Sequence, residues 1–349
     1  MQTVDAARAD DQRRVAEPTV ALLLTPEVRA MMLSPEAEER LRSFARVVEP
    51  EGGQLTPETM PALLQGAQVA LTGWKTPPIT EELLAAHPDL QLVAHSAGSI
   101  RQLVPADAIE RGRLRVSHAA ICIAEAVAEF VLAQTFMHLR RPHLQDEAMK
   151  AGQEWFTIRK TMLGRLLGNL TVGIVGAGYV GRLVIGLFRA FRARVLVADP
   201  FLSEQRAKEL GVEIASLDEL MRQSDVVSLH APVLPETRHM IGAAQLDLLR
   251  DGALFINTAR SPLVDQEALL AALRTGRFTA ALDVFDTEPL PGDSPFRSVP
   301  NAILSPHSAG HTSDTYRRQG DVAVEETGRF LSGSALRHEV TRAMLSTMA

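Results

Sequence analysis

The stretch that decides the fold is LTVGIVGAGYVG, residues 170–181. Thr171 to Val175 is a short, mostly β-branched apolar run, and this pattern predicts a buried strand. Gly176, Gly178 and Gly181 follow in the spacing G-x-G-x-x-G, and the residues after them have the pattern of an amphipathic helix. A strand that turns through three glycines into a helix is typical of a dinucleotide-binding unit.

Each glycine has a physical role in such a turn. Gly176 allows the tight turn out of the strand, Gly178 lets a pyrophosphate approach the backbone, and Gly181 lets the helix pack close to the strand. The N–H groups of the first helical turn, at Tyr179 and Val180, and the positive end of the helix dipole then face the phosphates. A glycine-rich turn alone is more often purely structural, so the prediction depends on the strands and the acid around it.

Asp199 completes the pattern and predicts which dinucleotide is bound. It ends a second apolar run, Arg194 to Ala198, and lies about twenty residues after the glycines. Its carboxylate can accept hydrogen bonds from both ribose hydroxyls and would repel a 2′-phosphate. Pro200 follows, where an NADP enzyme often has a basic residue. The sequence therefore favours NAD over NADP.

Composition excludes several classes of protein. The length of 349 residues suggests two domains, each large enough for its own core. A net charge of −6, no basic block and 5% aromatic residues argue against nucleic acid as a partner. No apolar run approaches membrane-spanning length, and the polar residues 1–18 are expected to form a disordered tail without a signal peptide's apolar core. Cys122 is the single cysteine, so no internal disulfide can form, and no histidine pair has metal-ligand spacing. We expect a cytoplasmic protein without a metal site or a membrane partner.

The rest of the chain alternates predicted strands and helices, which implies α/β domains with parallel sheets. In the first half we expect strands at 19–24, 45–48, 69–72, 90–95 and 114–117, and helices at 35–44, 57–65 and 80–86. This half has no dinucleotide fingerprint and is interpreted as a separate domain. A long apolar helix at 121–140 and an irregular stretch at 145–168 come next. In the second half we expect strands at 171–175, 194–198, 226–229, 253–257, 279–284 and 302–304. The helices of this half are expected at 217–222, 243–249, 266–273 and 312–331.

Polar residues follow the strands of the second half, at the edge that carries the glycine turn. Ligands of an open parallel sheet bind beyond the carboxyl ends of its strands. The residues at those ends are His230, Pro232, Thr258, Ala259, Arg260, Asp283, Asp286, Glu288, Pro306 and His307. One guanidinium, one carboxylate and one imidazole are therefore expected to meet where a nicotinamide would lie. His95 and His118, which end strands of the first half, are interpreted as structural.

The predicted trio suits the reduction of a 2-oxo acid. Arg260 can bind the substrate carboxylate through two parallel hydrogen bonds and polarise the adjacent carbonyl. His307 would give a proton to the alkoxide formed by hydride transfer, and would take it back in the reverse direction. Glu288 would orient His307 and stabilise its protonated form. Each residue alone is compatible with a surface or loop position, so the hypothesis rests on the three taken together.

The chain resembles the D-isomer-specific 2-hydroxyacid dehydrogenase family, which holds D-glycerate, glyoxylate/hydroxypyruvate and phosphoglycerate dehydrogenases. The resemblance runs from about Thr19 to Leu331. Besides the glycine turn it rests on LHAPVLPET at 229–237, FINTAR at 255–260, ALDVFDTEP at 281–289 and SPHSAG at 305–310. It implies NAD-dependent interconversion of a small 2-oxo acid and its D-2-hydroxy acid, with catalytic residues Arg260, Glu288 and His307.

The resemblance also implies the domain arrangement and the remaining contacts. It implies two Rossmann-like domains, with an NAD-binding domain at 119–309 inserted into a flavodoxin-like substrate domain at 19–118 and 310–349. Homodimers are expected, built largely on the helix at 121–140. Asp283 would hold the nicotinamide amide, and the loop at Ser96 to Ser99 would give backbone N–H groups to the substrate carboxylate. The full set of expected cofactor contacts is Gly176, Gly178, Tyr179, Val180, Gly181, Asp199, His230, Pro232, Thr237, Thr258, Ala259, Arg260, Asp283, His307 and Gly310, and the expected substrate contacts are Ala97, Gly98, Ser99, Trp74, Lys75, Arg260 and His307.

Departures from the family pattern leave the substrate open. Trp74 stands about where phosphoglycerate enzymes have an arginine, which disfavours phosphoglycerate. Lys75 would meet an anionic substrate tail or remain a solvated loop lysine. Ser261 and Pro262 replace the glycine that commonly follows the catalytic arginine. An NAD(H)-sensing, corepressor-like protein on the same fold is the main alternative. A formate or phosphite oxidiser is a minor one, and Glu288 counts against it because formate enzymes have glutamine there.

Overall fold

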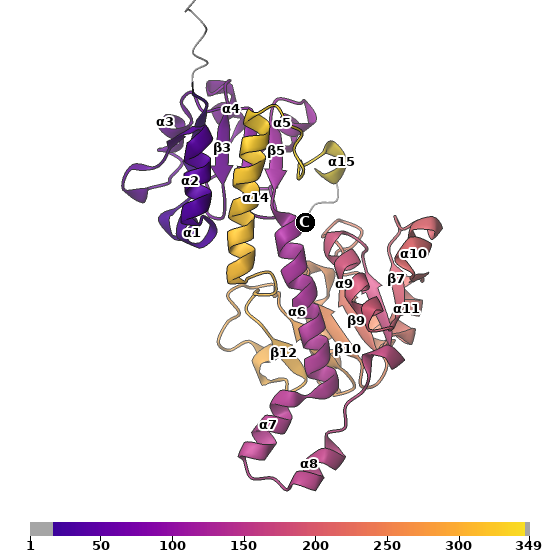
Figure 1. Cartoon of the computed structure of the whole chain (residues 1–349). Coiled ribbons are helices and arrows are strands. Elements are labelled where there is room, and N and C mark those ends of the chain that lie inside the picture. The colour runs from indigo at the N-terminus through magenta and orange to yellow at the C-terminus, as the bar shows by residue number, and fades with distance from the viewer. Residues whose placement is uncertain (1–16, 346–349) are drawn as a thin grey trace, which may run out of the picture. The chain divides into compact units, whose positions relative to one another are not determined.

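The computed structural model describes residues 17–345, which form two compact units (Figure 1). Unit 1 runs as far as Ala120 and resumes at Tyr316, whereas unit 2 comprises Ile121–Thr315. Unit 2 is thus inserted into unit 1 along the chain. The tail expected at 1–18 lies outside the described residues except for its last two positions.

Unit 1 is built on a five-stranded parallel sheet with the order β2-β1-β3-β4-β5. This is the flavodoxin-like strand order. All strands except the edge strand β2 are buried almost throughout, because helices cover both faces of a sheet of this kind. The strands are β1 (Thr19–Leu23), β2 (Arg46–Val48), β3 (Val69–Thr72), β4 (Leu92–His95) and β5 (Arg115–His118).

Helices of unit 1 begin at recognisable caps. Thr25, Ser34 and Thr80 each accept a backbone N–H of the helix that follows them. The closing helix packs on the core of the sheet through Ala323 and Val324. The helices are α1 (Pro26–Met32), α2 (Pro35–Phe44), α3 (Met60–Leu64), α4 (Glu81–Ala86), α5 (Ala106–Glu110), α14 (Ser313–Leu331) and α15 (Arg342–Leu345).

Unit 2 is built on a seven-stranded parallel sheet with the order β12-β11-β10-β9-β6-β7-β8. Its strands are β6 (Thr171–Val175), β7 (Arg194–Ala198), β8 (Glu213–Ile214), β9 (Val226–Leu229), β10 (Leu254–Asn257), β11 (Thr279–Leu282) and β12 (Ala302–Leu304). The chain order reverses between β6 and β9, which makes their carboxyl ends the topological switch point where ligands of such sheets bind. Gly176 and His230 lie there, and their segments touch.

The sheet of unit 2 is covered by apolar residues on both faces. One cluster contains Phe255 and Leu229, and the other contains Phe188 together with Val131 of the long helix. The helices are α6 (Ala120–Arg140), α7 (Pro142–Lys150), α8 (Trp155–Thr161), α9 (Tyr179–Ala190), α10 (Glu204–Leu210), α11 (Leu217–Gln223), α12 (Ala243–Asp247) and α13 (Gln266–Leu273).

Two sequence expectations need correction. The stretch at 145–168, expected to be irregular, contains most of α7 and all of α8; Pro142 begins α7 and the Glu154 carboxylate caps α8. The statement that no apolar run approaches membrane-spanning length is wrong for α6, which has the length and hydropathy of a membrane span. Burial of Val127, Val131 and Leu139 in the core of unit 2 explains part of its apolar composition, since 44% of the apolar window is buried.

Candidate active site

The glycine turn between β6 and α9 has backbone geometry that requires glycine at two positions. Gly176 has a φ of 95°, and a Cβ there would meet the backbone of His230 at 2.8 Å. A Cβ at Gly181 would lie 2.1 Å from the Gly176 carbonyl oxygen, so glycine alone lets α9 approach β6 this closely. At Gly178 a Cβ would meet no atom within 4 Å, which leaves open space above the turn.

The first turn of α9 is open to an anion. No side chain caps this helix, whose first N–H groups belong to Tyr179, Val180 and Gly181. The helix is twelve residues long, so its dipole favours negative charge at this end. The guanidinium of Arg182 lies 5.7 Å from the centre of the exposed Tyr179 ring. A diphosphate fits both the space and the electrostatics of this turn.

Asp199 lies beside the turn and holds it. Its Oδ2 accepts a hydrogen bond from the Ala177 N–H at 2.6 Å, and its Oδ1 accepts one from the Phe201 N–H at 2.8 Å. Each carboxylate oxygen has two lone pairs, so acceptor capacity remains for ribose hydroxyls.

Two buried polar atoms at neighbouring strand ends have no partner within residues 17–345. His230 Nε2 lies 2.9 Å from Ser228 Oγ, but its Nδ1 is unpaired, as is Thr258 Oγ1. Burial lowers the pKa of His230 to about 3, so the ring is neutral. An unpaired buried polar atom destabilises a fold unless a ligand satisfies it. These orphaned atoms and the open turn fit a nicotinamide dinucleotide.

His307 and Glu288 form a close pair in unit 2. His307 Nδ1 lies 2.7 Å from Glu288 Oε2. The φ of His307 is 51°, a left-handed value that a histidine adopts when its surroundings hold it there. Burial acts to raise the pKa of Glu288, but hydrogen bonds from His307 and the Phe285 N–H, together with the charges of His307 and Arg260, outweigh it and lower that pKa. Glu288 therefore stays ionised and fixes the orientation of the imidazole.

Arg260 joins this pair electrostatically. Burial lowers the pKa of its guanidinium, and the charge of Glu288 opposes that shift. Its Nη1 donates to the Ala259 carbonyl at 2.7 Å. The structure thus brings the expected guanidinium, carboxylate and imidazole together within unit 2.

Sequence reasoning missed two residues that shape the Arg260 turn. Asn257 is fully buried; its Oδ1 accepts from the Ala259 N–H and its Nδ2 donates to the Arg260 carbonyl, both at 3.1 Å. Ser261 Oγ hydrogen-bonds Asp286 Oδ1, which ties the Arg260 turn to the segment before Glu288. An asparagine at a strand end was a usable signal, because it favours turns of this kind. The serine and the aspartate lie 25 residues apart and offered none.

Asp283 holds the segment that carries His307. It is 1% exposed. Its Oδ1 accepts from Ser305 Oγ at 2.5 Å and from the Ser308 N–H at 2.9 Å, and its Oδ2 accepts from the Ala309 N–H at 3.0 Å. The carboxylate thereby fixes the turn after β12.

Two other expected cofactor contacts have structural partners. Thr237 Oγ1 donates to the Pro232 carbonyl at 2.6 Å and accepts from the Leu234 N–H, which closes the turn after β9. A Cβ at Gly310 would lie 2.7 Å from Ile123 Cγ2, so this glycine packs tightly on α6.

The expected substrate contacts other than Arg260 and His307 lie in unit 1. Ser96 to Ser99 follow β4; Ser96 is buried, Gly98 is half-buried and Ser99 is exposed. Trp74 stacks edge-on against Tyr316, with ring centres 5.2 Å apart. Lys75 Nζ forms an exposed ion pair with Glu27 Oε2 at 2.6 Å.

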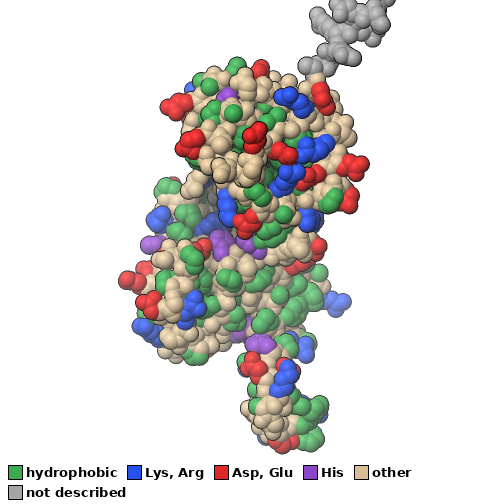
Figure 2. Space-filling view, turned by 90° about the vertical axis from the view of Figure 1, so that its left-hand side faces the viewer, with side chains coloured by type: hydrophobic (Ala, Val, Ile, Leu, Met, Phe, Trp, Pro, Cys, Tyr) green, Lys and Arg blue, Asp and Glu red, His purple; other side chains and the backbone are tan. Residues whose placement is uncertain are grey.

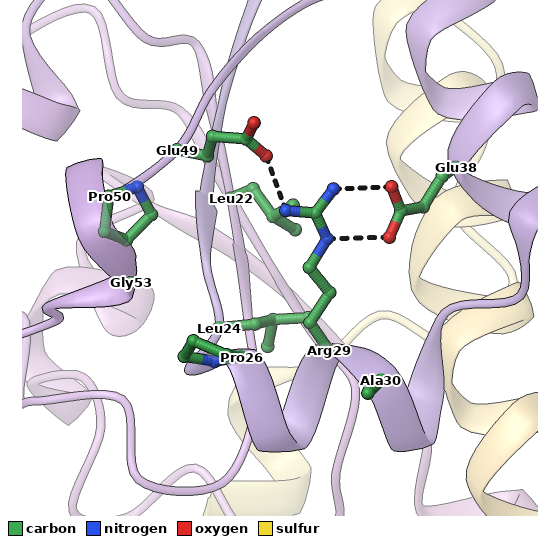
Figure 3. A pocket seen from close by; sticks show the side chains of 9 residues that line it. All are labelled: Leu22, Leu24, Pro26, Arg29, Ala30, Glu38, Glu49, Pro50 and Gly53. Carbon is green, nitrogen blue, oxygen red and sulfur yellow. Dashed lines mark hydrogen bonds and ion pairs between the residues drawn. The ribbon is translucent and has the colours of Figure 1, made fainter.

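A separate cavity of about 380 Å³ opens beside the carboxyl end of β1 in unit 1 (Figure 3). Arg29 lies in its wall and is bound by both oxygens of Glu38 and by Glu49, at 2.6–2.7 Å. Two carboxylates more than offset one guanidinium, so this cavity presents no net positive charge to an acidic substrate. Across the described residues, no group of three or more His, Cys, Asp or Glu side chains is placed to hold a metal ion.

The sequence of unit 2 matches a known family domain. The match is to "D-isomer specific 2-hydroxyacid dehydrogenase, NAD binding domain" and covers residues 132–309, which include the glycine turn and the whole trio. The chain belongs to the D-isomer-specific 2-hydroxyacid dehydrogenase family. It is therefore an NAD-dependent oxidoreductase that interconverts 2-oxo and 2-hydroxy acids.

Full-length relatives extend the match to both units. The glyoxylate reductase of Aeropyrum pernix is 35% identical over 315 residues, 88% of this chain and 93% of that protein. That of Korarchaeum cryptofilum is 36% identical over 76% of this chain and 80% of its own length. The crystal structure of a phosphoglycerate oxidoreductase from Rhizobium etli has a TM-score of 0.78 at 29% identity and covers 92% of this chain and 97% of that one. The fold expectation of two parallel-sheet α/β domains is confirmed.

Proposed function

We propose that this enzyme reduces a small 2-oxo acid to its D-2-hydroxy acid with NADH, in the cytoplasm, using Arg260, Glu288 and His307. The observation that carries the proposal is the 2.7 Å contact between His307 Nδ1 and an ionised Glu288. That contact leaves Nε2 of the imidazole to exchange a proton with substrate.

The residues of the trio have distinct tasks. NADH, when bound, supplies the hydride. Arg260 binds the substrate carboxylate through two parallel donors and draws electron density from the adjacent carbonyl. His307 donates the proton that the developing alkoxide requires, and Glu288 stabilises the charged imidazolium that makes this donation possible. In the oxidative direction, neutral His307 accepts the proton of the hydroxyl group.

Other residues position the two reactants. We assign the glycine turn, Asp199, His230 and Thr258 to the dinucleotide, as their space and unpaired polar atoms allow. Asp283 keeps the role of a nicotinamide amide acceptor, which the one remaining lone pair, on Oδ2, permits. The N–H groups of the loop at Ala97, Gly98 and Ser99 bind the substrate carboxylate.

The substrate is small and of the glyoxylate or hydroxypyruvate class. The two glyoxylate reductases that match most of this chain support this choice. Lys75 is already paired with Glu27, which counts against a strongly anionic substrate tail. We assign residues 19–118 and 310–349 to substrate binding and 119–309 to cofactor binding, and we infer a homodimer.

Turnover assays test the proposal. NADH consumption would be followed with glyoxylate, hydroxypyruvate, pyruvate and bulkier 2-oxo acids, and NADPH would be assayed in parallel. We expect turnover of a small acid with NADH, a loss of at least about 100-fold in His307→Ala, and a smaller loss in Glu288→Gln. Both variants should still bind NADH. Turnover that survives His307→Ala at the wild-type rate would remove the imidazole from the mechanism.

A further inference from the structure

The loop after β4 has an unusual distribution of hydrogen bonds. The carbonyl oxygen of Ala97 accepts from the Ala119 N–H at 2.9 Å. The carbonyl oxygen of Gly98 lies 3.2 Å from Nδ1 of His118, and the backbone of Ser99 lies close enough to the ring of His95 to favour its protonated form. The carbonyls of Ala97 and Gly98 are therefore bound to the body of unit 1, and the backbone of Ser99 adjoins the ring of His95.

The N–H groups of the same loop have no hydrogen-bond acceptor among the described residues. A trans peptide is planar, so the N–H of each residue points opposite to the carbonyl of the residue before it. Fixing the carbonyls of Ala97, Gly98 and Ser99 thus turns the N–H groups of Gly98, Ser99 and Ile100 away from the sheet. Within residues 17–345, none of these three N–H groups donates to another residue. Successive unpaired N–H groups of this kind form an anion-binding concavity.

The tautomer of His95 determines which of its ring nitrogens can donate a hydrogen bond to this loop. It ends β4 and is 5% exposed, and its Nδ1 lies 3.0 Å from Thr72 Oγ1. The contact with Ser99 favours the protonated ring, which identifies the acceptor as the carbonyl oxygen. Since Nδ1 is occupied by the threonine hydroxyl, Nε2 is the nitrogen that donates to Ser99. Burial lowers the pKa of His95 to about 4, so a single proton resides on Nε2.

His118 contacts the loop through Nδ1, whereas His95 uses Nε2. It ends β5 in register with His95, so the two rings are neighbours on one face of the sheet. It is 6% exposed, and burial lowers its pKa, so the ring is neutral near pH 7. A carbonyl oxygen can only accept, which requires a proton on Nδ1 of His118.

We propose that His95 and His118 are positioning residues, one donating through Nε2 and the other through Nδ1, that hold the loop at 97–100 with its N–H groups turned toward the carboxylate of the bound 2-oxo acid. The assignment of the carboxylate to this loop rests on the proposed function, whereas the hydrogen-bond pattern of the loop is independent of it.

Asparagine and glutamine are expected to have opposite effects on the KM for the 2-oxo acid at His95 and His118. The side-chain nitrogen of asparagine takes the place of histidine Nδ1, and that of glutamine takes the place of Nε2. We expect His118→Asn and His95→Gln to keep the KM for the 2-oxo acid within about twofold of wild type. His118→Gln and His95→Asn, the matched controls, should raise that KM about tenfold or more, the effect of about 1.4 kcal/mol on binding. The Kd for NADH should be unchanged in all four. Equal KM values for asparagine and glutamine at both positions would overturn the proposal.

A spectroscopic readout tests the pattern without turnover. Nitrogen-15 NMR of the histidine rings should show His95 protonated at Nε2 and His118 protonated at Nδ1 in the wild-type protein. The reverse tautomer at either residue would refute the assignment even where a variant fails to fold.

The two proposals fail in different ways. Wild-type protein that turns over no 2-oxo acid would overturn the proposed function alone. Oxamate, a carboxylate that is not reduced, then replaces substrate as the probe. Its addition should shift the Ser99 amide resonance in wild type and His118→Asn but not in His118→Gln. A Ser99 amide insensitive to oxamate in wild type would overturn the inference.

Discussion

At the scale of single residues, the histidines of this enzyme differ in burial, and one of them, His307, has a carboxylate partner. His307 is 47% exposed at its side chain and paired with Glu288, whereas His95 and His230 are enclosed by protein. Desolvation penalises a charged ring in the interior, and it lowers the pKa of both His95 and His230. The proposed function accordingly uses His307 for proton transfer, and the buried rings are available as neutral hydrogen-bonding groups.

The buried histidines predict that the protein loses stability in mild acid. The folded-state pKa is about 4 for His95 and about 3 for His230, below the ordinary value of 6.5. The unfolded chain thus binds protons first as the pH falls below about 6.5, so the free energy of unfolding decreases down to the folded-state values. His95 alone accounts for a loss on the order of 3 kcal/mol between pH 6.5 and 4.

Urea unfolding between pH 4.5 and 7 measures this effect. His95→Gln removes one titrating group while keeping a donor for Ser99, so its stability should depend less steeply on pH than that of wild type. Parallel pH profiles for the two proteins would show that His95 does not titrate as a buried neutral ring.

At the scale of elements, the site depends on how closely α9 approaches β6. Gly181 and Gly178 both belong to the fingerprint, but the structure separates their roles. A Cβ at Gly181 would meet backbone at 2.1 Å, whereas a Cβ at Gly178 would meet nothing within 4 Å. The fold requires glycine at 181, whereas at 178 only the proposed dinucleotide would require it.

We predict that the two alanine variants differ in stability. Gly181→Ala should lower the free energy of unfolding by about 1–3 kcal/mol, because α9 must shift, and should weaken NADH binding as well. Gly178→Ala should leave the free energy of unfolding within about 1 kcal/mol of wild type yet still weaken NADH binding, since its methyl group occupies the path of the pyrophosphate. Denaturant unfolding and NADH fluorescence titration measure both quantities. Equal destabilisation by the two variants would contradict the division of roles.

At the scale of the whole molecule, six of the ten large apolar side chains that are exposed among the described residues lie at 144–166, on α7, α8 and the residues just after them. Trp155 is 58% exposed and Phe156 is 69% exposed, and other large apolar side chains stand out nearby at Leu144, Met149, Leu163 and Leu166. Figure 2 shows hydrophobic side chains over this segment at the lower end of the view. A concentration of this kind marks an interaction surface.

The inferred homodimer is expected to be built largely on α6, and we predict that its interface extends over this surface. We predict that Trp155→Glu combined with Phe156→Glu shifts the protein from dimer to monomer, because two charges would have to be desolvated at an apolar interface. Sedimentation at micromolar concentration measures the change. Phe201→Glu is the matched control, since Phe201 is 82% exposed in unit 2 but lies outside this segment. A dimer that survives the double substitution would place the interface elsewhere.

Local chemistry explains what sequence reasoning predicted correctly about the fold. The glycine turn, its flanking strands and the pattern of parallel α/β domains follow from backbone constraints and hydrophobic periodicity, which act over a few residues. Short elements such as α10 and β8 were missed, because seven and two residues carry little periodic signal. The segment at 145–168 was predicted wrongly for a related reason, since its short helices leave large apolar residues such as Trp155 and Phe156 exposed and therefore lack a clear apolar face.

The sequence by itself determined the cofactor turn, the class of reaction and the residue types at the strand ends, because parallel strands present their carboxyl ends at one edge. Only the tertiary structure decided which side chains hold those groups in place. The contacts of Ser261 with Asp286, and of His118 with Gly98, join residues 25 and 20 positions apart. Such pairs exist only after neighbouring strands have paired in register, and no local pattern in the chain encodes that alignment.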